Sequence, residues 1–144
     1  MLLLAVGAAL GQPAPPPNDD LARIEAEPNL PKRAHAALEN ADQALKEARE
    51  AYAKGDVAAA TARLDEVQRS VELADSALKQ TGKDPGRSPK HFKQAELRTR
   101  ELLRKLDNFR EQMSVADRAP EERVAGVVQK IHDAWLDGIM GKKK

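Results

Sequence analysis

Three histidines, His35, His91 and His132, are the residues of this chain best suited to hold a metal ion or move a proton. A helical bundle can hold a pair of carboxylate-bridged metal ions when Glu-x-x-His motifs lie on two of its helices. None of the three histidines has a glutamate three positions before it, and no His-Glu-x-x-His zinc motif occurs. We therefore predict no metal site.

Cofactor and nucleophile chemistry also lacks its usual motifs. The absence of cysteine excludes disulfides, thiolate ligands and covalent haem attachment. Met113 and His132 are conceivable haem ligands, but His132 lies at the flank of its helix's apolar face, which is typical of a boundary or surface histidine. No Gly-x-Ser-x-Gly motif and no phosphate-binding glycine-rich loop occur. We predict no cofactor and no enzymatic activity; the alternative is an envelope enzyme or a redox bundle without a visible motif.

One segment is strongly basic in a chain whose net charge is only +1. Residues 79–105 contain nine basic and three acidic residues, a local charge of +6. At about 100° per residue, Lys93, Arg100 and Arg104 fall on one strip opposite the apolar face of a predicted helix. Leu97 falls inside the same strip, where a polar residue is expected.

This strip and the loop before it form our candidate binding surface for an acidic partner. Its residues are Lys83, Arg87, Lys90, Lys93, Leu97, Arg100 and Arg104. The alternative interpretation is a solvated helix face with one stray leucine. Phe92, which stands among these bases, belongs to the apolar face of the helix and is not placed to stack on nucleic acid, and the expected export also argues against nucleic acid. A protein, an anionic envelope component or a second copy of the chain therefore fits better.

A helical hairpin over about residues 34–78 organises the rest of the chain. Its arms carry apolar residues at steps of three and four, the spacing of an amphipathic helix. These residues are Ala34, Leu38, Ala41, Leu45, Ala48 and Tyr52, then Val57, Ala60, Leu64, Val67, Val71, Ala74 and Leu78. Gly55 can end the first helix and Asp56 can cap the second, so the arms should lie antiparallel.

Two further helices with the same spacing are expected, from Pro89 to about Ser114 and from Pro120 to about Gly141. Their inward residues are Phe92, Ala95, Thr99, Leu102, Leu106, Phe109 and Met113, then Val124, Val127, Val128, Ile131, Trp135 and Ile139. The aromatic share of only 3% fits a core packed with alanine and leucine. We predict an all-α fold, an antiparallel up-down four-helix bundle, with two stacked helical hairpins in a solenoid-like arrangement as the alternative.

The first ten residues form an apolar run that is too short to cross a bilayer as a helix. Small residues before Gln12 resemble a signal-peptidase site, although no Lys or Arg precedes the run. We expect a signal peptide over 1–11, a Pro-rich spacer and a short helix over 12–33, the bundle over 34–141 and a basic tail over 142–144. The sequence thus predicts an exported protein, periplasmic or extracellular, with no transmembrane helix and a binding or structural role.

Overall fold

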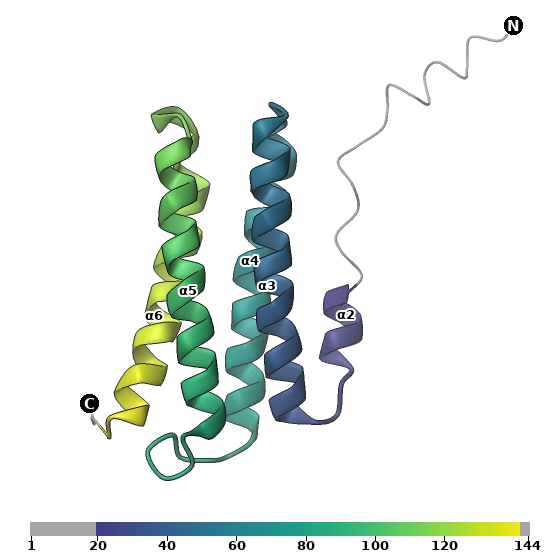
Figure 1. Ribbon diagram of the computed structural model, residues 1–144. Coiled ribbons are helices and arrows are strands. Elements are labelled where there is room, and N and C mark those ends of the chain that lie inside the picture. The colour runs from purple at the N-terminus through teal and green to yellow at the C-terminus, as the bar shows by residue number, and fades with distance from the viewer. Residues whose placement is uncertain (1–19, 142–144) are drawn as a thin grey trace, which may run out of the picture.

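The computed structural model describes residues 20–141, and the expected signal peptide, proline run and basic tail lie outside them (Figure 1). All regular elements in this range are helical. They are α2 (Asp20–Glu25), α3 (Leu30–Ala53), α4 (Val57–Gln80), α5 (Lys90–Gln112), the 3₁₀ turn η1 (Val115–Asp117) and α6 (Ala119–Ile139). None of these helices is both long enough and apolar enough to span a membrane.

The turn between α3 and α4 forms as the sequence predicts. Gly55 has a φ of 83°, a left-handed conformation that glycine adopts at little cost. The Asp56 side chain then accepts a hydrogen bond of 3.0 Å from the Ala59 amide and caps α4. At the other end of α3, the Asn29 side chain caps the helix by accepting from the Lys32 amide at 2.9 Å. The two helices therefore meet at the expected turn, with α3 ending at Ala53 and α4 beginning at Val57. The start of α3 at Leu30 lies earlier than the expected start at about Ala34.

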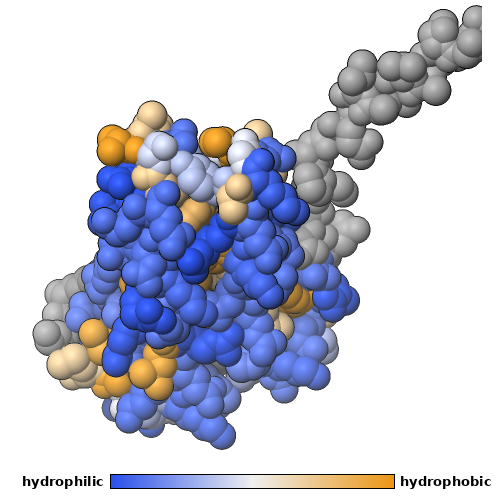
Figure 2. Space-filling view, turned by 45° about the horizontal axis from the view of Figure 1, so that its top comes forward, coloured by the Kyte–Doolittle hydropathy of each residue, from blue (hydrophilic) through white to orange (hydrophobic). Residues whose placement is uncertain are grey.

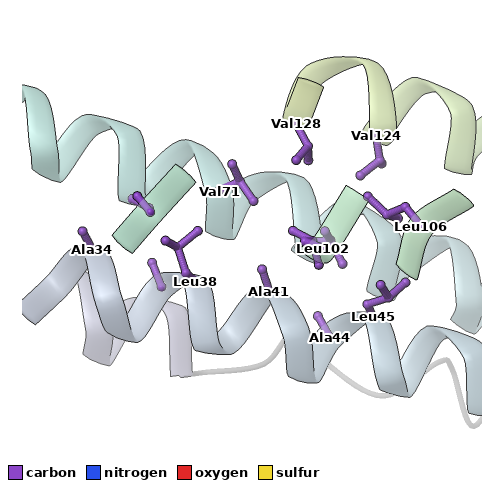
Figure 3. Packing of buried hydrophobic residues seen from close by; sticks show 14 of the residues in the cluster. Ala34, Leu38, Ala41, Ala44, Leu45, Val71, Leu102, Leu106, Val124 and Val128 are labelled. Atoms are coloured by element: carbon purple, nitrogen blue, oxygen red, sulfur yellow. The ribbon is translucent and has the colours of Figure 1, made fainter. Parts of the chain in front are cut away.

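The two arms of this hairpin pack closely because α3 presents alanine to α4. Ala37, Ala41 and Ala48 are each 0% exposed. Leu45, Leu64 and the valines of α4 fill the space between the small residues, as Figure 3 shows for part of the core. Two expected inward residues are not fully buried. Tyr52 is half-buried, and Val57 is 40% exposed because it is the first residue of α4 and projects from the turn.

A second hairpin consists of α5 and α6, and a tyrosine joins its turn to the first hairpin. The Tyr52 hydroxyl accepts from the Ser114 amide at 2.8 Å and donates to Asp117 at 2.9 Å. Its ring also meets Phe109 edge-on, with ring centroids 5.8 Å apart. Along α6, Val124, Val128 and Trp135 are buried, while the expected inward residues Val127, Ile131 and Ile139 are only half-buried.

The predicted all-α, up-down four-helix bundle is confirmed, and the hairpins are arranged side by side within it. The close neighbours across the two hairpins are α3 with α5 and α4 with α6, and each of these pairs runs in the same direction (Figure 1). Leu38 and Leu45 of α3, Leu102 and Leu106 of α5 and Val124 and Val128 of α6 all belong to one core (Figure 3). The short helix α2 packs on α3 and buries Ile24.

Candidate functional site

The loop before α5 and the first turn of α5 carry four cations that have no acidic partner among residues 20–141. Among residues 20–141, Lys83, Arg87, Lys90 and Lys93 form no ion pair within 4 Å, and all four are exposed. Leu97 lies one turn beyond Lys93 and is 54% exposed, as its position in the strip predicts. We call these five residues the loop-end surface.

The loop that carries this surface is held against the end of α6. A Cβ atom placed on Gly138 would lie 2.9 Å from Cγ of Pro85, so glycine permits the loop to approach the helix. Asp84 orders the next turn, since its side chain accepts from the Arg87 amide at 3.2 Å. Met140, just past the end of α6, is 60% exposed, and Figure 2 shows that hydrophobic areas are small on a face that is otherwise mostly hydrophilic.

A pair of glycine substitutions tests this contact. Gly126→Ala should stabilise the protein by about 0.5–1 kcal/mol, because Gly126 lies in α6 with open space around it. Gly138→Ala gains the same helix propensity but brings its methyl group against Pro85. We expect its melting temperature to be at or below that of the wild type. If both variants melt equally high, the loop does not pack against Gly138.

The other two cations of the predicted surface, Arg100 and Arg104, are exposed as their positions on the helix predict, but each pairs with a carboxylate of α5. Arg100 donates two hydrogen bonds, of 2.9 and 2.8 Å, to the buried carboxylate of Glu96. Arg104 pairs with Glu101, and its hydrogen bond is the main cause of the lowered pKa of that carboxyl group. The structure therefore divides the predicted strip into a free part at the loop end and a neutralised part further along α5.

Glu96 also contacts His132 of α6, a residue that we expected at a boundary or on the surface. His132 is buried at 7% exposure, because α6 turns this side of the helix toward α5. Its Nε2 lies 2.8 Å from Glu96 Oε2, and its Nδ1 lies 3.2 Å from Asp133 Oδ1. Burial raises the pKa of Glu96, but the hydrogen bonds from His132 and Arg100 outweigh it, so the pKa is lowered. Glu96 is thus an ionised, hydrogen-bonded carboxylate inside the bundle.

The hydrogen-bonding groups of the Glu96–His132 pair are engaged by neighbouring side chains. The nearest hydroxyl on the same helix, that of Thr99, donates to the carbonyl oxygens of Ala95 and Glu96. Both ring nitrogens of His132 already lie within hydrogen-bond distance of carboxylates. A haem bound through this imidazole would have to break one of these contacts. The only sequence signal for the pair was the four-residue spacing of Glu96 and Arg100, which says nothing about α6.

Two open grooves lie between neighbouring helices of the bundle. The first, of about 600 Å³, lies between α3 and α5 and has both signs of charge along it. There Asp42 pairs with Arg98 at 3.2 Å and with Lys105 at 3.6 Å, across the groove. Asp42 therefore pairs with two bases of the neighbouring helix α5.

The second groove, of about 410 Å³, lies between α5 and α6 near their connecting turn. One of its lining residues is Glu121, which is only 1% exposed. The sequence placed Glu121 in the first turn of α6, where an acidic residue favours the helix dipole. Its deep burial was not predicted, because it follows from the approach of α5.

Within residues 20–141, no group of three or more histidine, aspartate or glutamate side chains is arranged to hold a metal ion. The fold defines a class of protein: a small all-α bundle in which four long helices pack as two helical hairpins. No family model, no curated protein and no solved structure matches the chain.

Proposed function

We propose that this bundle is an exported binding protein without enzymatic activity, and that its loop-end surface contacts an acidic partner. The partner is an acidic protein or another anionic component of the cell envelope. Location outside the cytoplasm is proposed from the apolar leader alone. The binding role is proposed from the charges at the loop end.

One observation carries the proposal: the bases of residues 79–105 divide into two groups. Those further along the chain, Arg98, Arg100, Arg104 and Lys105, each pair with an acid, as does Lys79. The four bases at the loop end have no ion pair with any residue of the 20–141 range. Free cations around an exposed leucine suit contact with an anionic surface, in which the charges attract the partner and the leucine adds apolar burial.

A charge-reversal pair tests the role of the loop end. Arg87→Glu combined with Lys93→Glu should weaken binding to immobilised heparin, an anionic polymer probe, by about ten-fold. The loss should be largest at low salt, because exposed charges are screened over about 10 Å at 0.1 M ionic strength. Salt-gradient elution and the dissociation constant at several salt concentrations give the result. We choose these two residues because reversing Arg100 would also disturb buried Glu96.

The matched control is Lys54→Glu combined with Lys130→Glu. Both residues are exposed, lie away from the loop end and form no ion pair with any residue between 20 and 141, so the change in net charge is the same. The control should elute close to the wild type. If both double variants lose binding equally, net charge alone is responsible and the loop end is no specific surface. Leu97→Ser should weaken binding less, with little dependence on salt.

A further inference from the structure

Three buried carboxyl groups lie in the two hairpins, and they differ in their hydrogen-bond partners. Glu66 accepts from Asn40 at 2.9 Å and from Arg63 at 2.8 Å. Glu96 accepts from Arg100 and contacts His132 at 2.8 Å. Glu121, although only 1% exposed, has no hydrogen bond with any residue of the described range, and its Oε1 is fully buried. A buried polar group without a partner is costly, so it points to a missing one.

Glu121 belongs to the lining of the open groove between α5 and α6, beneath its surface. The aliphatic side chains of Leu103 and Ala125 supply apolar lining. Gln129 lies along the same groove and offers an amide group. The groove therefore combines an apolar surface, suited to a short carbon chain, with one unsatisfied acidic group.

The charges around this groove favour a cation over an anion. Asp107 of α5 and Glu122 of α6 line it together with Glu121. The guanidinium of Arg110 is the one base lining it, and it is already engaged by Asp107 at 2.9 Å and by Glu111 at 3.1 Å. These three acidic side chains would repel a ligand carboxylate or phosphate, whereas they would attract a cation.

We propose that this groove binds a primary ammonium group on a short alkyl chain, with the Glu121 carboxylate as its counterion. An ammonium brings three hydrogen-bond donors and needs no converging set of ligands. A divalent metal would need such a set, and none is arranged between residues 20 and 141. The alkyl chain can lie against Leu103 and Ala125. The ammonium can belong to a free diamine or to a lysine side chain of a partner protein.

Binding should depend on pH in a way that identifies Glu121. The pKa of Glu121 is raised to about 7, chiefly by burial. Glu122 and Asp107 contribute to the rise, while Arg110 of α5 and Arg118 of the connecting segment oppose it. An ammonium pairs with the ionised form, so at neutral pH it must displace a proton. Affinity should rise between about pH 6 and pH 8 and fall only when the amine itself loses its proton, near pH 10.

Titration calorimetry of the full chain with n-butylamine tests the proposal, with 1-butanol as the uncharged control ligand. We expect binding of the amine and none of the alcohol. In two buffers of different ionisation enthalpy, the apparent binding enthalpies should differ in the sense of proton release. Putrescine and Nα-acetyl-lysine amide then distinguish the sources: tighter binding of the first indicates a free diamine, and tighter binding of the second indicates a protein lysine.

Glu121→Gln should weaken amine binding roughly ten-fold or more and remove the proton release, because the charge-assisted hydrogen bond is lost. Glu50→Gln, at an exposed carboxylate of α3, is the matched control and should bind as the wild type does. Circular dichroism of both variants checks that the fold is kept. Equal affinity of Glu121→Gln and wild type, or binding of butanol as tight as that of butylamine, would overturn the proposal.

Discussion

Ala48→Glu should destabilise the bundle by more than about 4 kcal/mol, a large part of the total stability of a small domain. Ala48 is 0% exposed on the face of α3 that packs against α4. A glutamate there needs space that the close packing of the two helices does not leave. It also buries a charged group, which is costly because the charge loses its hydration. We expect a partly unfolded protein at room temperature, measured by urea denaturation followed by circular dichroism.

Lys46→Glu is the matched control, two residues away on the same helix. Two residues turn the helix by about 200°, so Lys46 lies on the solvent-exposed face of α3. The change adds a like charge near Asp42 and Glu50, which costs at most about 1 kcal/mol. Leu45→Ala, at a side chain that is 1% exposed, should fall between the two at about 2–5 kcal/mol. Equal melting temperatures for the two glutamate variants would show that the helical phase of α3 is wrong.

Glu121→Gln should raise the free energy of unfolding by up to about 3 kcal/mol at pH 8. Near pH 4.5 the substitution should change this free energy little. The pKa of Glu121 is raised from 4.5 to about 7, chiefly by burial. Between these two values the folded state keeps a proton that the unfolded state has released. The free energy of unfolding therefore falls as pH rises from about 4.5 to about 7, and it stays low above that range. Glutamine removes this dependence because its amide stays neutral.

The measurement is the difference in unfolding free energy between variant and wild type at pH 5 and at pH 8. Taking the difference cancels the other titrating groups, which include Glu96 and Asp133 with lowered pKa values. Those two carboxylates act in the opposite direction: they stabilise the fold above about pH 4.5 and lose this contribution as the pH falls. The exposed Glu50→Gln should show no such change. A pH-independent effect of Glu121→Gln would mean that Glu121 is ionised in the folded protein.

The two proposals concern different parts of the molecule and can fail separately. The loop-end surface lies at the start of α5, and the Glu121 groove lies at the opposite end of the α5–α6 hairpin (Figure 1). Arg87 and Lys93 play no part in the groove, and Glu121 plays none at the loop end. Loss of heparin binding with retained butylamine binding, or the reverse, would therefore assign each property to its own site.

The sequence determined the elements of this fold and their inward faces. Apolar residues at steps of three and four predicted α3, α4 and α5, and nearly all of those positions are buried. Gly55 and Asp56 placed the first turn, because left-handed glycine and a capping carboxylate act on neighbouring residues. The exposure of Leu97 was also predictable, since a helix's own period decides which residues face away from its apolar side.

Only the tertiary structure decided which charged residues pair between helices and which carboxylates are buried. Asp42 pairs with α5 rather than with its own helix, and Glu96 meets His132 of α6, because the packing of neighbouring helices sets these contacts. Arg100 pairs with Glu96 at a four-residue spacing that the sequence already shows, and the packing of α6 adds the burial of that carboxylate. The sequence identifies Glu121 only as an acidic residue in the first turn of a helix, and its burial at 1% exposure follows from the packing of the bundle. Helix period is a local property of the chain, whereas desolvation and pairing across helices exist only once the helices are packed.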